Sequence, residues 1–326
     1  MSFKSVLYDF GKPCGLFYAT KWIAKSHPRI LMYHRISGTT GNGEFPVDVF
    51  RSQIKTLKKW FNPVSISQLI SSFSVGRSIQ NAVVVTFDDG YYDFAEYAFP
   101  ILQEEGVPVT LFATTGFIND DLWLWPDQIL YALESCERRP ICVDGIKGLS
   151  DSNLNNKECW NIIADHCLTL SSEKRDIVIR NLYRSLDLVI PSRAPERFRP
   201  LSWSQIKDMQ KFGLTVGSHS YSHPVLSKLS DQQIYNELNL SKEMIERNLD
   251  CSVEGFCYPN GMKCDFDCRV KSTLIEIGYK WAVTAYPTPS PLADLFEISR
   301  YSAGASMEQY FKTVFGLKYL SMRFSS

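Results

Sequence analysis

The sequence predicts an α/β protein, a distorted (β/α)7 barrel with an inserted, mainly helical cap. Short apolar runs rich in Val, Ile and Leu alternate along the chain with amphipathic stretches of helical period. This alternation is typical of strands and helices that form a parallel sheet. Two of the apolar runs stop at polar clusters, at 86–90 and at 219–223. Parallel strands that deliver polar groups to the open end of a barrel end in this way.

The first part of the predicted barrel covers residues 29–118. Residues 30–34 read as a strand that ends in a histidine, and 82–86 and 109–113 read as the next two strands. A helix is expected over 47–61, where apolar residues recur on one side, and another over 92–105, where Gly106 is a typical C-cap.

The strand–helix alternation stops between residues 119 and 199, which we interpret as an insertion or cap with helical pieces near 127–137 and 173–187. The barrel pattern resumes over 200–304, and the elements expected there are helices at 204–212, 231–249 and 270–277 and strands at 214–217, 255–258 and 281–284. Ser230 and Gln233 form a predicted capping box for the second of these helices. Residues 1–28 are expected to form an amphipathic N-terminal segment, and 305–326 a basic, aromatic C-terminal tail.

The composition is that of an ordinary globular protein, with 44% apolar and 21% charged residues. The formal net charge is zero, which argues against nucleic acid as the main partner. The nine cysteines include no C-x-x-C pair and favour reduced thiols in a cytoplasm. Charged residues interrupt the apolar residues of 1–25, and no apolar run reaches about 18 residues, so we expect neither a signal peptide nor a membrane span.

Basic and aromatic residues are interleaved near both ends of the chain. Residues 1–35 hold six Lys or Arg against one Asp, and 309–326 hold three Lys or Arg and no acid. One interpretation is peripheral contact with the inner face of a membrane. The alternative is a pair of terminal helices that pack on the barrel and leave their lysines in water.

Asp88 and Asp89 follow a predicted strand directly, and Gly90 lets the backbone turn so that both carboxylates can face one cavity. His219 and His223 are four residues apart after another strand, a spacing that suits two ligands of one metal ion. Each pair also has a simpler interpretation, a helix cap or a polar loop before Pro224. Taken together, one Asp and two His make the open ligand set of a catalytic divalent metal, and the second Asp is a base beside it.

With these two motifs, the sequence resembles the polysaccharide deacetylases of the nodulation-protein-B homology type, also called carbohydrate esterase family 4. The family motif T-F-D-D-G is intact at 86–90 and H-[ST]-x-x-H at 219–223. The resemblance covers roughly 29–118 and 200–304. It implies that Asp89, His219 and His223 bind a divalent metal, usually zinc, with cobalt, nickel or iron as alternatives. It also implies that Asp88 is the general base.

The third family motif, R-x-P-[FY], is altered to Cys257-Tyr258-Pro259-Asn260-Gly261, and Cys257 stands where the family has arginine. We hypothesise that Arg300, which follows a later strand, reaches the same carboxylate from a neighbouring barrel position. The loop at Pro259 keeps its shape-determining residues, and the backbone N–H of Asn260 is the expected oxyanion donor.

The family's last motif, L-x-H near the C-terminus, is absent, because no histidine follows His223. The segment Leu31-Met32-Tyr33-His34 has the form of this motif and resembles the circularly permuted members, such as poly-N-acetylglucosamine deacetylases. By that resemblance His34 is the general acid that protonates the leaving amine. The alternative is a structural histidine at a strand end.

Several aromatic side chains are candidates for contact with sugar rings, which bind apolar faces with a polar rim. The expected substrate-binding residues are Tyr221, Trp125, Tyr258, Pro259 and Tyr91, with packing in the core as the alternative for each.

The sequence therefore predicts a metal-dependent hydrolase that removes the N-acetyl group from an amino sugar in a polysaccharide or a lipid-linked precursor of a surface glycan. An O-deacetylase or an N-deformylase with the same site is a second hypothesis. A non-catalytic glycan-binding module is a third, since the arginine of the third motif is missing.

Overall fold

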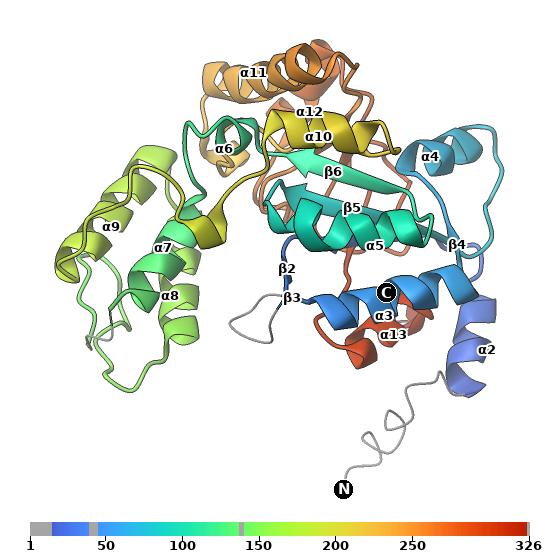
Figure 1. The fold of residues 1–326 in the computed structure, drawn as a ribbon, viewed down its shortest axis with the longest axis horizontal. Coiled ribbons are helices and arrows are strands. Elements are labelled where there is room, and N and C mark those ends of the chain that lie inside the picture. The colour runs from blue at the N-terminus through green and yellow to red at the C-terminus, as the bar shows by residue number, and fades with distance from the viewer. Residues whose placement is uncertain (1–14, 39–44, 137–139, 325–326) are drawn as a thin grey trace, which may run out of the picture.

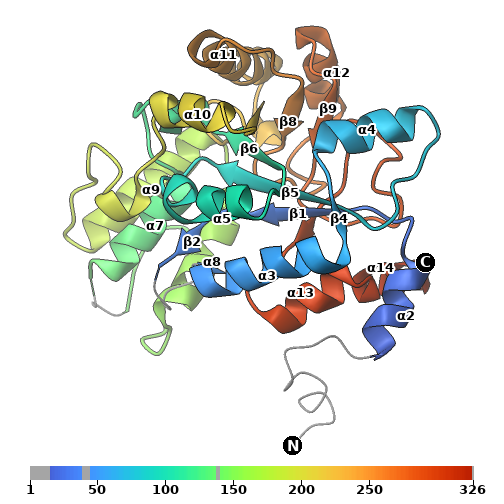
Figure 2. The same cartoon turned by 45° about the vertical axis from the view of Figure 1, so that its right-hand side comes forward.

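The computed structural model describes residues 15–38, 45–136 and 140–324. Its centre is a parallel sheet in the order β10-β1-β5-β6-β7-β8-β9, curled into a barrel (Figures 1 and 2). The strands are β1 (Arg29–Tyr33), β5 (Ala82–Asp89), β6 (Val109–Ala113), β7 (Thr215–Ser218), β8 (Gly255–Cys257), β9 (Trp281–Val283) and β10 (Tyr301–Ser302). β4 (Asn62–Pro63) pairs with the start of β5, and β2 (Ile36–Ser37) pairs with β3 (Phe45–Pro46) apart from the barrel.

The segment from Ile298 to Ser302 closes the ring of strands. Ile298 forms a parallel bridge with Val283 of β9, and Thr284 N donates to Ile298 O at 2.9 Å. Three residues later the same segment becomes β10 and pairs with β1, with Leu31 opposite Tyr301. The predicted seven-stranded (β/α) barrel is therefore confirmed, and its first and last strands are neighbours.

Alternation along β5 explains how the barrel core and the candidate site are built on one strand. All eight residues of β5 are buried. Val83, Val85 and Phe87 pack against the surrounding helices in one apolar cluster. Ala82 and Val84 belong to a different cluster, which joins side chains from strands around the ring and therefore fills the barrel interior. By this period of two, Thr86 and Asp88 continue the inward row.

Helices surround the barrel as a parallel α/β fold requires. In Figure 1, α10 (Trp203–Gln210), α11 (Asp231–Leu249) and α12 (Cys268–Ile277) lie above the sheet, and α3 (Val47–Trp60) and α13 (Met307–Val314) lie below it. α5 (Phe99–Glu104) follows a π-helical turn at Phe94–Ala98, and α4 (Ile66–Ser74) lies near the start of the strands. The Ser230–Gln233 capping box of α11 is present as predicted.

Three helices form a compact unit beside the carboxyl ends of the strands: α7 (Trp125–Glu134), α8 (Asn156–Leu168) and α9 (Ser172–Ser185). They share an apolar cluster of their own, in which Ile129, Ile163 and Leu182 are fully buried. α6 (Thr115–Ile118) precedes this unit in the chain. The sequence pattern indicated helices over α7 and α9 but not over α4, α6 or α8.

The terminal helices α2 (Gly15–Ile23) and α14 (Leu317–Phe324) pack beside α13. Of the aromatic residues of the C-terminal segment, Tyr310, Phe311 and Phe315 are buried in the main core. The burial of these three rings agrees with the alternative interpretation, in which a terminal helix packs on the barrel. The charged residues before Gly15 lie outside the described residues. Within the described part of the chain, no helix is both long and apolar enough to cross a membrane.

Candidate metal centre and active site

Asp88 and Asp89 are brought to one side of the barrel mouth by a change of backbone conformation at the end of β5. Asp88 continues the inward row of the strand, whereas strict alternation would turn Asp89 outward. Asp89 instead has φ of 73° and Gly90 has φ of 100°. A side chain at Gly90 would also approach Ile118 to 2.5 Å. The glycine is therefore needed for both the turn and the packing behind it.

The two histidines face Asp89 from the loop that follows β7. The Nε2 atoms of His219 and His223 each lie 3.6 Å from Asp89 Oδ1. The three ligand atoms lie within 4.8 Å of one another, and all three residues are buried. The predicted set of Asp89, His219 and His223 is therefore brought together by the fold.

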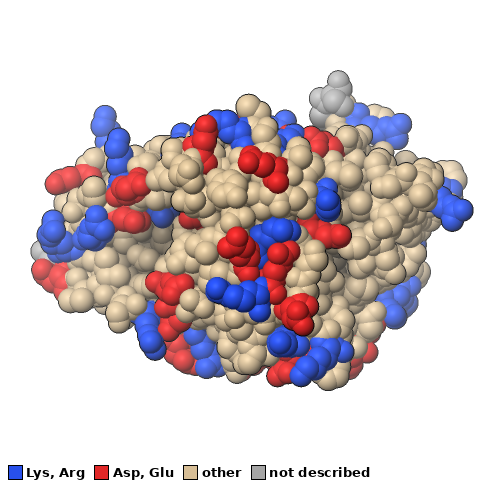
Figure 3. Space-filling view, turned by 90° about the horizontal axis from the view of Figure 1, so that it is seen from above, with Lys and Arg blue, Asp and Glu red and all other residues tan. Residues whose placement is uncertain are grey.

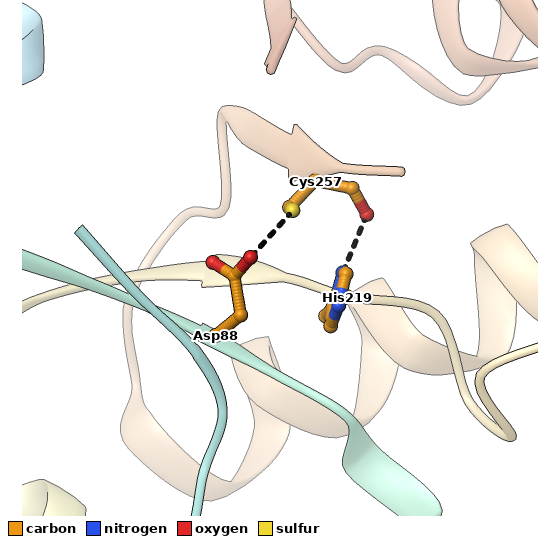
Figure 4. A group of neighbouring side chains, drawn as sticks. All are labelled: Asp88, His219 and Cys257. Carbon is orange, nitrogen blue, oxygen red and sulfur yellow. Dashed lines mark hydrogen bonds between the residues drawn. The ribbon is translucent and has the colours of Figure 1, made fainter. Parts of the chain in front are cut away.

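The free ligand atoms of this trio fit a divalent cation. Asp89 Oδ1 is buried and has no hydrogen-bond partner among the described residues. His219 Nδ1 donates to the carbonyl of Cys257 at 2.8 Å (Figure 4). This bond fixes the tautomer and leaves the lone pair of Nε2 directed to Asp89. Two imidazoles and one carboxylate, which has an unpaired oxygen, are the donor set of an open zinc-type site.

Backbone conformation at the site is unusual. Among the described residues, eight non-glycine residues have positive φ, and four of them are Asp89, Ser220, His223 and Asn260. Conformations of this kind cost about 1–3 kcal/mol and persist only where the surrounding structure holds them. Ser220 Oγ accepts from His223 N at 3.0 Å and so supports the turn that returns His223 to the metal set.

Glu237 of α11 holds the histidine loop from behind. Its carboxylate accepts from Tyr221 N at 3.0 Å, Ser222 N at 2.9 Å and Ser222 Oγ at 2.6 Å. Three donors on one carboxylate fix the loop between the two histidines. Glu237 was not among the residues predicted from the sequence, because it lies mid-helix and no local motif distinguishes it.

Asp88 forms a buried ion pair with Arg300 of the closing segment. Arg300 Nη1 donates to Asp88 Oδ1 and Nη2 to Asp88 Oδ2, both at 2.7 Å. Burial by itself would raise the pKa of Asp88, but the charge and hydrogen bonds of Arg300, with smaller contributions from His219 and His34, hold it below its usual value. The hypothesis that Arg300 reaches this carboxylate agrees with the geometry.

For the neighbouring groups Asp89, His219 and His223, burial favours the neutral form over the charged form. Burial, followed by the charges of Asp88 and Asp127, raises the pKa of Asp89 well above its usual value. Burial lowers the pKa of His219 to about 4, and burial with the help of His219 and Arg175 lowers the pKa of His223 well below its usual value. The imidazoles are therefore neutral near pH 7, which is the form that binds metals.

Cys257 completes the surroundings of Asp88 (Figure 4). Its Sγ lies 3.5 Å from Asp88 Oδ2 and accepts from Arg300 Nη2 at 3.0 Å. Asp88, His219 and Cys257 also form a second cluster of potential ligands. Arg300 already occupies Asp88 and the thiol, and burial raises the pKa of Cys257 well above its usual value, so the Asp89 trio is the better metal site.

His34 lies at the rim of the site, with Nε2 3.8 Å from Asp88 Oδ2. Its side chain is 47% exposed and lines a cavity of about 780 Å³ between the ends of β1 and β10 and helices α7 and α8. Partial burial of the ring, aided by Arg300 and opposed by Asp88, lowers the pKa of His34. Water at the exposed half of the ring screens this effect.

The same cavity contains a carboxylate that was not predicted. Asp127 of α7 lines the cavity, and Tyr91 Oη donates to its Oδ2 at 2.7 Å. Burial raises the pKa of Asp127 to about 6. The only sequence signal was an acidic residue in the first turn of a helix, which is common at helix N-termini.

The aromatic predictions need correction. Trp125 and Tyr91 are each 5% exposed and Tyr258 only 1%, so none of these rings is available to stack on a sugar. Tyr258 stacks instead on Phe266 with ring centroids 3.8 Å apart. Pro259 is likewise buried. Tyr221 remains partly exposed, and its hydroxyl donates to Asp121.

Asn260 follows β8 at the same end of the barrel, with φ of 58°. Its Nδ2 is buried and has no hydrogen-bond partner among the described residues. The turn places Gly261 N 2.6 Å from the carbonyl of Pro259. The structure thus retains a sharp turn at this position, as predicted.

Comparisons with known proteins agree with this fold and site. A family model described as polysaccharide deacetylase matches residues 76–282, more than half of the chain, and the chain therefore belongs to this family. The matched span includes Asp88, Asp89 and the two histidines, whereas His34 and Arg300 lie outside it.

Two curated relatives from Bacillus subtilis (strain 168) match only part of the chain. YxkH, whose name carries a provisional assignment as a polysaccharide deacetylase, is 32% identical over 116 residues, 33% of this chain and 40% of that protein. The uncharacterized protein YlxY is 36% identical over 55 residues, 17% of each chain. The chain thus spans less than half the length of either relative.

Among solved structures, the Streptococcus pyogenes deacetylase PplD in complex with acetate aligns over 88% of this chain and 97% of its own, with a TM-score of 0.59 and 19% identity. IcaB from Ammonifex degensii aligns over 89% and 96%, with a TM-score of 0.59 and 17% identity. BC0361, a polysaccharide deacetylase from Bacillus cereus, aligns over 88% and 68%, with a TM-score of 0.53 and 19% identity. At these identities the similarity demonstrates a shared fold.

Proposed function

We propose that this protein hydrolyses the N-acetyl group of an amino sugar in a polysaccharide or a lipid-linked glycan precursor. The observation that carries the proposal is the pairing of two units at one barrel end. One is the Asp89, His219 and His223 trio, and the other is Asp88, held ionised by Arg300. Membership of the polysaccharide deacetylase family supplies the substrate class.

Asp89, His219 and His223 would hold a divalent cation, with zinc as the first candidate for this donor set and cobalt, nickel or iron as alternatives. Such an ion would supply Lewis acidity, which would polarise an acyl carbonyl and lower the pKa of water at the site to about 7. The bond from His219 to the carbonyl of Cys257 holds the imidazole in its ligating orientation.

Asp88 is the proposed general base. Its carboxyl group is ionised across the neutral range because the positive charge of Arg300 lowers its pKa. In this form it accepts the proton of the attacking water. Arg300 occupies the oxygen atoms of Asp88 with two parallel hydrogen bonds and so sets the direction in which the carboxylate faces. This pairing also weakens the binding-module hypothesis, which rested on the missing arginine of the third motif.

His34 is the proposed general acid. When water adds to the acetyl carbonyl, the C–N bond breaks and the amine nitrogen needs a proton. The His34 ring lies at the cavity rim beside Asp88, where a leaving amine has access from solvent. The backbone N–H of Asn260 is the proposed donor to the developing oxyanion. The products are acetate and the free amino sugar.

The proposal is tested by elemental analysis and acetate release on protein purified without chelator. We expect about one zinc, cobalt, nickel or iron per wild-type chain, loss of the metal in His223→Ala, and retention in the matched control His166→Ala. Asp88→Asn should keep the metal and lose acetate release from N-acetyl sugars. Release of acetate from O-acetyl sugars alone, or of formate from N-formyl sugars, would instead support the alternative hydrolases. Metal-free wild-type protein after incubation with zinc would overturn the proposal.

The site of action is proposed to be the cytoplasm, at the inner face of a membrane. The described cysteines are all free thiols, which suits a reducing compartment.

A further inference from the structure

Three short segments carry half of the exposed apolar side chains of the described molecule. Fourteen large apolar residues are exposed in the described part of the chain. Seven of them lie on α2, at the end of α4 or on α14, namely Leu16, Tyr18, Trp22, Ile23, Phe73, Val75 and Phe324. Trp22 is 70% exposed and Phe324 is 82% exposed. Apolar residues concentrated in this way mark an interaction surface.

A groove of about 760 Å³ joins the three segments into one surface. Ile23 of α2, Phe73 of α4 and Tyr319 of α14 line it together with Leu292. Arg77 and Arg323 also line the groove, so its surface is both apolar and cationic. We call this surface, with the exposed side chains around it, the basal face.

The basal face is positively charged, although the whole chain is neutral. Residues 15–33, 49–87 and 309–326, which supply most of it, contain no Asp or Glu, and neither does the remaining groove segment, 289–293. The acid next to the groove lining, Asp294, is paired with Lys271 at 2.6 Å. In Figure 3, a view from above, the right-hand end of the molecule, where α4 lies in Figure 1, is largely tan with some blue, and most red side chains lie toward the middle and the left-hand end.

The cations of this face lie beside aromatic rings. Lys25 Nζ is 5.3 Å from the centroid of Trp22, and Lys21 Nζ is 6.0 Å from that of Trp60. Exposed Trp, Ile and Phe side chains with Lys and Arg between them are the pattern of a helix that lies in a membrane interface. Basic residues add attraction to anionic headgroups.

We propose that the basal face docks the protein on the surface of an anionic lipid bilayer. Nucleic acid would match the charge but not the exposed Ile23, Val75 and Leu16, which gain nothing from phosphates. A second copy of the chain would bring two cationic faces together in a symmetric dimer, and like charges oppose that contact. A bilayer surface satisfies the apolar and the cationic residues at once.

The proposed docking orients the candidate active site. The basal face is built from segments that precede β1 and β5, together with terminal helices, at the amino ends of the strands. Asp88, Asp89 and the histidines lie at the carboxyl ends, toward the helical unit in Figures 1 and 2. The catalytic cavity therefore opens away from the docked surface.

The test is co-sedimentation of the full-length chain with vesicles of phosphatidylcholine alone or with about 30% phosphatidylglycerol. Wild type should bind the anionic vesicles, and binding should fall steeply between 50 and 500 mM salt, because the headgroup attraction is screened. The triple variant Lys21→Glu/Lys25→Glu/Arg77→Glu should bind at least about 100-fold more weakly. Trp22→Ser/Phe73→Ser should also weaken binding. The matched control, Ile177→Ser/Val189→Ser, removes exposed apolar residues from the helical unit and should bind like wild type.

Circular dichroism and a melting curve show that each variant is folded, and acetate release or metal content reports separately on the catalytic site. No binding of wild type to anionic vesicles would overturn the proposal. Equal loss in the helical-unit control would also overturn it. A dimer in light scattering that the Trp22→Ser/Phe73→Ser variant dissociates would assign the face to a second copy instead.

Discussion

Arg300 of the segment that closes the barrel and Asp88 at the end of β5 are joined by two hydrogen bonds of 2.7 Å between buried side chains. The family motif places an arginine at position 257, on β8, and this chain has Cys257 there. The thiol accepts a hydrogen bond from Arg300 and fits beside it. The charge that orients the carboxylate therefore comes from a different strand than the motif indicates.

Arg300→Lys keeps the charge but cannot form the two-pronged pair, so we expect kcat to fall at least tenfold with little change in KM. Arg300 lowers the pKa of Asp88, and without the full pairing that pKa rises. The acid limb of the kcat/KM profile should therefore move to higher pH. Cys257→Ser, which keeps a small polar acceptor, should leave this limb close to that of wild type. An unchanged profile in Arg300→Lys would show that Arg300 does not position the base.

Glu237→Gln removes the charge that binds three donors of the histidine loop. Groups that orient metal ligands typically contribute 10–100-fold in metal affinity, and we expect a loss in that range, measured by competition with a chromophoric chelator. Glu243→Gln, on the exposed side of the same helix, is the control. Equal affinities in the two variants would contradict a positioning role for Glu237.

Asp127→Asn tests the cavity between the barrel and the helical unit. Burial raises the pKa of Asp127 to about 6, so its carboxylate would be a full hydrogen-bond acceptor for sugar hydroxyls above that pH and a weaker one below it. We expect the KM of wild type for a glycan substrate to rise as the pH falls through 6. The variant should show a higher KM at pH 7.5 and no such dependence. Glu134→Gln, at the same cavity, controls for the loss of charge alone.

His27 should make the stability of the fold dependent on pH at a position remote from the site. Its ring is buried, with Nε2 2.8 Å from Tyr301 Oη, and burial with the charge of Arg29 lowers its pKa to about 3. The neutral ring is the folded form, so its full contribution is present above the unfolded pKa of about 6.5. As the pH falls from 6.5 toward 3, the free energy of unfolding should drop by about 1.4 kcal/mol per pH unit.

The measurement is urea unfolding of wild type and His27→Gln between pH 4 and pH 7.5. The difference between the two proteins isolates this group from the other titrating residues. A constant difference over the whole range would contradict the prediction, and His166→Gln serves as the surface control.

The barrel strands were predictable because each is a short apolar run with polar or turn-forming residues at its ends. β6 and α11 begin and end at the predicted residues. α8 was missed because its buried side chains are two cysteines, one alanine and one isoleucine, which leave a weak apolar pattern. The metal trio was predictable because its three residues belong to two short motifs, each of which can be recognised from neighbouring residues in the sequence. Glu237 and Asp127 were not, since only tertiary contacts bring them to the site.

The aromatic predictions went wrong for Tyr91, Trp125 and Tyr258 for a related reason. The side chain of an aromatic residue near a motif can point to either side of the backbone. The sequence does not indicate which of the two sides faces the hydrophobic core. Here Tyr91 turns toward Phe117 and Asp127, and Tyr258 toward Phe266. Burial of these rings supports the loops that carry the polar groups.

The hydrogen-bonded ladders between neighbouring strands of the barrel differ in length. β1 and β6 each pair with β5 over five residues, whereas β10 pairs with β1 over two, and Ile298 before it meets β9 through a single bridge. Amide hydrogen exchange should therefore be slowest on β5 and faster along 298–302 and where β7 meets β8, because short ladders open at lower cost than long ones. Arg300 lies within that weakly held segment. Each opening of it would separate the guanidinium from Asp88, so the lifetime of the closed barrel sets how long the base stays aligned.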